Sequence, residues 1–108
     1  MSEDEVAFGV HTEERTDHVR LVVTGELDLY REPELRSAVE ALLAQGPPQR
    51  LVLDVGELQF LDSAGLRGLL ACRDRARSAA VPFSLAVAPG PVTRLLDLAG
   101  VRSWFTYE

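Results

Sequence analysis

Lysine is absent from this sequence, and cysteine and tryptophan each occur once. The single thiol, Cys72, excludes an intrachain disulfide, and its small-residue surroundings predict a buried side chain rather than a reactive one. Without lysine the chain has no Walker-type phosphate loop.

No apolar run approaches the roughly 20 residues of a membrane span, and the acidic N-terminus does not resemble a signal peptide. The sequence therefore predicts a cytoplasmic protein with no membrane insertion.

Charge is distributed unevenly over the 108 residues, whose net charge is −6. Residues 1–62 carry 14 acidic and five basic side chains, whereas residues 63–108 carry three acidic and six basic ones. The net acidity argues against nucleic-acid binding. Every basic residue is an arginine. Arginines suit paired contacts with the carboxylates of a protein partner, or they form a solvated surface.

The length and the ordinary composition fit one domain over residues 1–108, large enough to fold without a metal. The acidic residues 1–5 are expected to be flexible. Hydrophobic patterns predict strands at 6–13, 19–24, 51–55, 83–87 and 104–105, and helices at 33–46, 63–80 and 91–99. The order β-β-α-β-α-β-α-β favours an α/β fold with a mixed sheet of four to five strands flanked by helices.

The loop Asp62-Ser63 follows a buried strand and opens a helix. Ser63 is therefore either a helix-capping serine or the site of an anion, since a helix N-terminus stabilises negative charge. Asp28, after the strand 19–24, either bonds to the backbone of its own turn or serves a site beside Ser63. Parallel pairing of the strands 19–24 and 51–55 would place both residues at the same edge of the sheet.

Two faces run along the helix predicted at 63–80. One face consists mainly of small residues and suits close packing on a sheet: Gly65, Gly68, Leu69, Cys72, Ala76 and Ala79. The neighbouring stripe begins with Leu66 and Leu70. These leucines, with Arg67 nearby, either contact a partner or belong to the core.

Three segments, in family-like order and spacing, resemble signatures of STAS domains: Gly25-Glu26-Leu27-Asp28, Asp62-Ser63-Ala64-Gly65-Leu66 and the segment 91–101. The resemblance covers residues 5–107 and implies a STAS-like fold and the role of an anti-sigma factor antagonist. In such partner switching, the unphosphorylated antagonist binds an anti-sigma factor and so releases a sigma factor. The anti-sigma factor is also a serine kinase that binds ATP, and a phosphatase resets the cycle.

Carried over to this chain, the resemblance makes Ser63 the phosphorylated residue. Many antagonists have a second serine next, but here the position is Ala64, which leaves one acceptor in the loop. The partner-binding surface would comprise Asp28, Asp62, Ser63, Ala64, Gly65, Leu66, Arg67 and Leu70. No cofactor is implied for this chain.

Other functions fit the sequence less well or require other partners. A hydrolase elbow needs glycine two residues before its serine, where this chain has Leu61. The histidines, His11 and His18, precede the serine and form a poor metal-binding set, so the chain is expected to be neither a hydrolase nor a metalloprotein. The alternative within the same fold is a non-phosphorylated scaffold subunit of a stress-sensing or lipid-transport complex.

Overall fold

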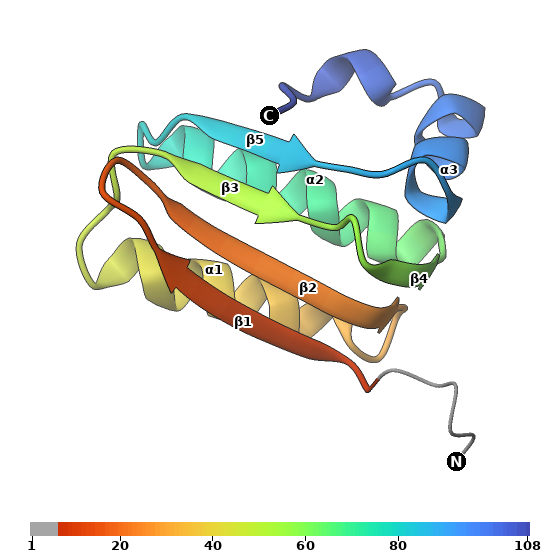
Figure 1. Ribbon diagram of the computed structural model, residues 1–108, viewed down its shortest axis with the longest axis horizontal. Helices are drawn as coiled ribbons and strands as arrows, with labels where there is room; N and C mark the ends of the chain where they lie inside the picture. The colour runs from red at the N-terminus through yellow and green to blue at the C-terminus, as the bar shows by residue number, and fades with distance from the viewer. Residues whose placement is uncertain (1–6) are drawn as a thin grey trace.

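The computed structural model describes residues 7–108, in which five strands and three α-helices form a mixed α/β fold (Figure 1). The strands are β1 (Gly9–Glu14), β2 (Val19–Leu27), β3 (Leu51–Asp54), β4 (Leu58–Leu61) and β5 (Phe83–Ala86). The helices are α1 (Glu32–Ala44), α2 (Ser63–Ser78) and α3 (Pro91–Ala99), followed by a 3₁₀ helix at Arg102–Trp104. Residues 1–5, and Val6 at the predicted start of the first strand, lie outside the described residues.

The long central strand β2 organises the sheet. Its first half pairs with β3 in parallel, and its last three residues, Gly25–Leu27, pair in parallel with β4. Within the β4 pairing the register shifts between Gly25 and Glu26, and Gly25 adopts a φ of +87° that glycine accommodates without strain. β1 adds to β2 as an antiparallel edge, and β5 lies in parallel on the far side of β3. The two short strands β3 and β4 thus share one neighbour.

One face of the sheet is covered by α1 and α2, which lie side by side behind the strands in Figure 1. The core fills the space between this face and the helices. Most of its fully buried members come from β2, β3 and both helices, with others from β5 and α3, and they include Leu21, Val23, Leu27, Leu35, Val39, Leu53, Leu69, Cys72, Leu85 and Leu96. Gly65 lets α2 approach the end of β2 closely, whereas Gly68 faces the Glu32 side chain of α1.

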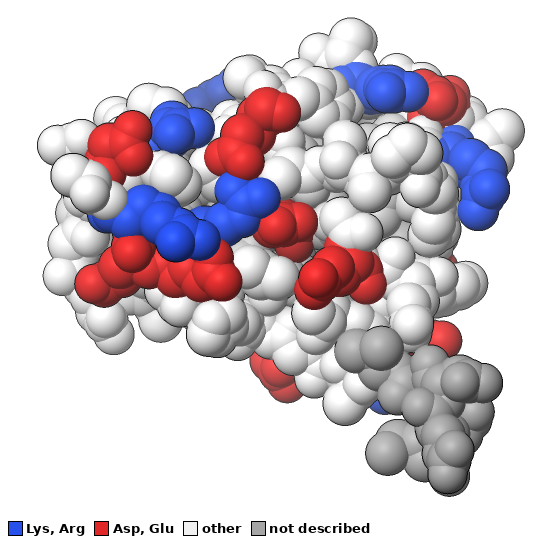
Figure 2. All heavy atoms as spheres, in the orientation of Figure 1, with Lys and Arg blue, Asp and Glu red and all other residues white. Residues whose placement is uncertain are grey.

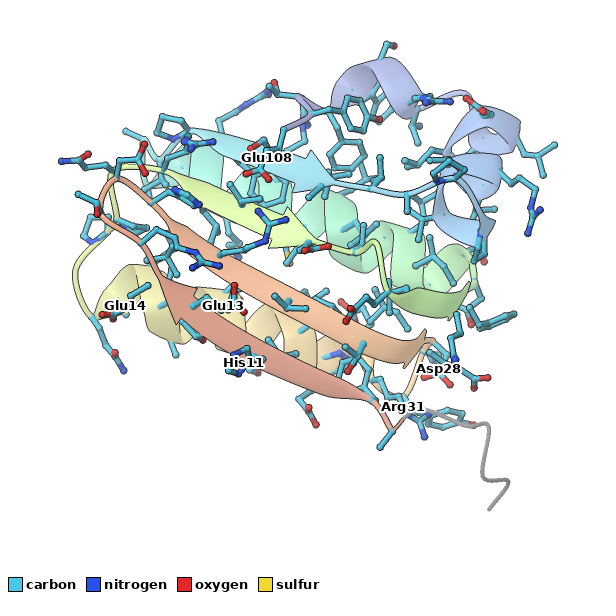
Figure 3. All side chains as sticks on the ribbon, in the orientation of Figure 1. His11, Glu13, Glu14, Asp28, Arg31 and Glu108 are labelled. Atoms are coloured by element: carbon cyan, nitrogen blue, oxygen red, sulfur yellow. The ribbon has the colours of Figure 1, made fainter. Side chains whose placement is uncertain are left out.

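The opposite face carries charged side chains, and carboxylates and arginines alternate over β1 to β3 in Figure 2. At its centre the Arg20 guanidinium donates to Asp54 Oδ2 from Nη2 at 2.8 Å and from Nε at 3.1 Å. It also donates to Glu108 Oε1 at 2.6 Å, which brings the last residue onto the sheet (Figure 3). Three segments far apart in the sequence are therefore joined through one arginine.

The α/β fold, the mixed sheet of five strands and the parallel pairing of β2 with β3 confirm the sequence-based expectation. The order of elements differs, because it is β-β-α-β-β-α-β-α. β4 was not predicted from the sequence. The strand predicted at 104–105 is wrong, because Trp104 ends a 3₁₀ helix and Tyr107, further on, bridges to Leu85 of β5.

Burial of Cys72 generates a prediction about the pH dependence of stability. Desolvation in the core raises the pKa of the Cys72 thiol to about 12, whereas an exposed cysteine has a pKa of about 8.5. The unfolded chain therefore loses this proton first as the pH rises, and the free energy of unfolding falls above about pH 8.5. Between pH 8 and 9.5 the wild type should lose about 1 kcal/mol more stability than Cys72→Ala in urea denaturation. Parallel pH profiles for the two proteins would contradict the assigned burial.

Candidate functional site

The candidate site lies where β2 and β4 end together, at the carboxyl edge of the sheet. Leu27 and Leu61 are paired as the last residues of these strands. Asp28 and Asp62, the next residues, therefore leave the sheet at the same edge, as expected from the sequence. The neighbour that brings them together is β4 rather than β3, so the missed strand is the one that positions the site.

The first turn of α2 is capped by Asp62. Its Oδ1 accepts a hydrogen bond from the backbone N–H of Gly65 at 2.8 Å, in the manner of an N-cap carboxylate. Ser63 is the first residue of the helix and its side chain is exposed to solvent. Of the two interpretations of Ser63, the capping role therefore belongs to its neighbour, and the hydroxyl group faces water at the positive end of the helix dipole.

Close contact between helix and strand fixes this turn in place. Gly65 lies against the end of β2, where an added Cβ would lie well inside van der Waals contact with the carbonyl oxygen of Leu27. The same carbonyl accepts a long hydrogen bond, 3.4 Å, from the N–H of Asp62. The glycine in the loop is thus needed for space, and it sets the distance between Ser63 and β2.

Asp28 organises the turn between β2 and α1. Its Oδ1 accepts hydrogen bonds from the backbone N–H groups of Tyr30 and Arg31, both at 3.0 Å. Its Oδ2 accepts one from Arg31 Nη1 at 2.9 Å, and Figure 3 shows the two side chains together. This is the turn-forming role that the sequence allows for an aspartate. Asp28 also lies at the same edge as Ser63, so it shapes the surface beside the serine.

The other candidate residues divide by burial. Ala64, Gly65 and Leu66 are buried, and Leu66 is only 8% exposed within the core. Arg67 is exposed and Leu70 is half-buried. Of the two interpretations left open for the leucine stripe, Leu66 fits the core. The accessible part of the predicted surface therefore consists of the exposed Ser63 and Arg67, with the half-buried Asp28, Asp62 and Leu70.

Exposed apolar side chains that were not singled out from the sequence lie in the segments that flank the site, directly after Asp28 and on β4. Leu29 is 58% exposed, Tyr30 84% and Phe60 46%, although all three are large and hydrophobic. Leu29 also lines a hollow of about 350 Å³ between α1 and α2, together with Ala64 and Arg67. Leu29 and Tyr30, directly after Asp28, could have indicated this surface from the sequence, because exposed apolar residues in a polar turn suggest a binding surface.

Within residues 7–108, no histidine lies at the carboxyl edge of the sheet beside Ser63. His18 precedes β2 and so lies at its opposite end, where its Nδ1 is 2.8 Å from Asp17 Oδ1. His11, on β1, is near Glu13. Residues 7–108 contain no group of three or more histidine, cysteine or acidic side chains suited to a metal ion. Nor does any helix in this range have the length and apolar character to cross a membrane.

Comparison with known proteins places this arrangement among related folds. A family model described as "Mlab, STAS domain" matches residues 10–105. The structure of an anti-sigma factor antagonist from Mycobacterium paratuberculosis is similar, with 26% identity and a TM-score of 0.83 over 94% of this chain and 85% of that one. The phosphorylated form of the Bacillus cell fate determinant SpoIIAA has 22% identity and a TM-score of 0.67, over 94% and 91% of the two chains.

The unphosphorylated form of the anti-sigma factor antagonist SpoIIAA has the same fold. It shows 20% identity and a TM-score of 0.74 over 94% of this chain and 88% of that one.

The contact at Gly65 predicts unequal effects of two similar substitutions in α2. Gly65→Ala should destabilise the protein by about 2 to 3 kcal/mol, because the new methyl group meets the rigid backbone of β2. At Gly68 the atoms nearest to an added Cβ belong to the side chain of Glu32, which would have to rotate away. Gly68→Ala should therefore stay within about 1 kcal/mol of wild type, since the better helix propensity of alanine offsets the displacement. Thermal and urea unfolding of both variants measures the difference, and equal stabilities would refute this packing argument.

Proposed function

This chain belongs to the STAS domain family, and we propose that it acts as an anti-sigma factor antagonist switched by phosphorylation of Ser63. In its unphosphorylated form it binds an anti-sigma factor in the cytoplasm and so frees a sigma factor. That anti-sigma factor is the serine kinase that modifies Ser63 with ATP, and a phosphatase restores the binding form. The carrying observation is an exposed serine in the first turn of α2, at the sheet edge where exposed apolar side chains follow β2 and lie on β4.

The position of Ser63 suits a modification that changes a surface and leaves the fold intact. The hydroxyl group is accessible to a kinase, and Asp62, not Ser63, caps the helix. A phosphate adds about −1.5 to −2 charges at neutral pH. The helix N-terminus tolerates that charge locally, while Asp62 beside it adds to the negative charge that a partner would meet.

The exposed apolar residues at this edge of the sheet support a protein partner over a small substrate. Leu29 and Tyr30 project from the turn that Asp28 holds, and Phe60 projects from β4. Aromatic side chains that are rigid and exposed are frequent energetic centres of protein interfaces. Arg67, one helical turn after Ser63, adds a cation at the same place. We therefore assign the partner surface to Ser63, Arg67, Leu29, Tyr30 and Phe60, with Leu66 supporting it from the core.

Phosphorylation of Ser63 is tested by intact mass after incubation with ATP and each candidate anti-sigma kinase of the same genome. We expect one added phosphate, which Ser63→Ala abolishes. Unmodified protein and Ser63→Ala should bind the kinase equally, and the phosphorylated protein should bind at least about thirtyfold more weakly, because a buried like charge costs several kcal/mol. Failure of every kinase to modify the chain would instead favour the non-phosphorylated scaffold of a stress-sensing or lipid-transport complex.

The assigned partner surface predicts a loss of affinity without a loss of stability. Tyr30→Ala should weaken kinase binding about tenfold, since an exposed aromatic anchor is removed. Its melting temperature should match that of wild type, because the side chain is 84% exposed. Trp104→Ala is the matched control, as it removes an aromatic side chain, 52% exposed, that lies beyond α3. Calorimetric titration measures both, and equal affinities of the two variants would place the interface elsewhere.

A further inference from the structure

A second hollow lies at the other end of α2, away from Ser63. It is bordered by the last turns of α2, the start of β5 and the segment 104–106, and its volume is about 310 Å³. β5 and α2 run in opposite directions in Figure 1, so the end of α2 and the start of β5 meet there. Arg73 and Arg77 lie ten and fourteen residues after Ser63, which corresponds to roughly 15 to 20 Å along the helix.

Arginines supply the polar side of this hollow. Arg77 lines it and takes part in none of the ion pairs formed within residues 7–108. Arg73 also lines it, and its Nη1 is 3.2 Å from Asp74 Oδ1 on the neighbouring residue. The Asp74 side chain is 66% exposed, so water screens this pair and both guanidinium groups are available to a ligand. Within residues 7–108, no acidic side chain lines the hollow.

Aromatic rings supply the apolar side. Trp104 is 52% exposed, although burial of its large ring would stabilise the protein more than burial of a smaller apolar side chain. Phe83, half-buried at the start of β5, and Phe105, buried after the 3₁₀ helix, line the same hollow. A flat ring stacks on such surfaces, and the planar guanidinium of arginine both stacks on rings and binds carboxylate or phosphate oxygens through paired donors.

We infer that this hollow binds a small aromatic anion, a flat ring that carries a carboxylate or a phosphate. The ring would lie against Trp104 and Phe83, and the anionic group would accept hydrogen bonds from Arg77 and Arg73. The volume is at the lower end of the range for ligand sites, which favours a ligand of one or two rings. Phosphate and carboxylate ligands share this chemistry, and the experiment compares them. The site is independent of the switch at Ser63.

The single tryptophan of the chain provides a specific signal for this site, because the protein has only one indole N–H resonance. We would titrate ¹⁵N-labelled full-length protein with benzoate and with phenyl phosphate, and follow the Trp104 indole signal. Benzamide is the neutral match for benzoate, and inorganic phosphate lacks the ring. We expect a saturable shift with one or both aromatic anions, and binding at least about tenfold weaker for benzamide and inorganic phosphate.

Two arginine variants separate binding at the hollow from general charge. Arg77→Gln should weaken the binding of the aromatic anion about tenfold, because a charged donor is lost. Arg75→Gln removes the same charge from the same helix, but Arg75 lies outside the hollow and pairs with Glu40 at 3.0 Å. Its affinity should equal that of wild type. The inference is overturned by the absence of a saturable shift, by equal binding of benzamide and benzoate, or by equal affinities of the two variants.

Discussion

The structure depends on one close approach, that of the first turn of α2 to the end of β2. A side chain at position 65 would occupy the space of the Leu27 carbonyl group, so glycine there allows the helix to begin against the strand. The Asp62 cap holds the turn from the other side. Together these contacts place Ser63 at the sheet edge with its hydroxyl group in water. The exposed hydroxyl group of Ser63 is therefore held in place by Gly65, which is buried, and by Asp62, which is hydrogen-bonded to the helix.

Much of this arrangement could be read from the sequence, because it depends on local signals. The helix predicted at 91–99 has those bounds in the structure, where proline begins it and Gly100 ends it with a φ of +70°. The parallel pairing of β2 with β3 follows from the β-α-β order. The start of α2 at Ser63 was predicted from the helical pattern, although the residue that caps the helix is Asp62 and not the serine.

The missing parts depend on contacts between distant residues. β4 has only four residues, and its buried ends flank two exposed residues, so it lacks the alternation that indicates a strand. Its pairing with β2 is visible only once both strands are placed. Two adjacent stripes of α2 had equally good helical spacing, and the sequence could not show that Leu66 faces the core. Trp104 has the β propensity of an aromatic residue, but it is the last residue of the 3₁₀ helix that begins at Arg102.

The division of β2 between two partners has a consequence for how this fold can diversify. The pairing with β3 ends at Val22, and the three-residue pairing with β4, which begins at Gly25, holds the loop that presents Ser63. A register shift between Gly25 and Glu26 lies within this second pairing. Substitutions in the segment after the shift can alter the presented surface while the strand that holds the core keeps its neighbours. Duplicated copies of such a domain can thus acquire separate partners and avoid cross-talk, with little change in the stability of the fold.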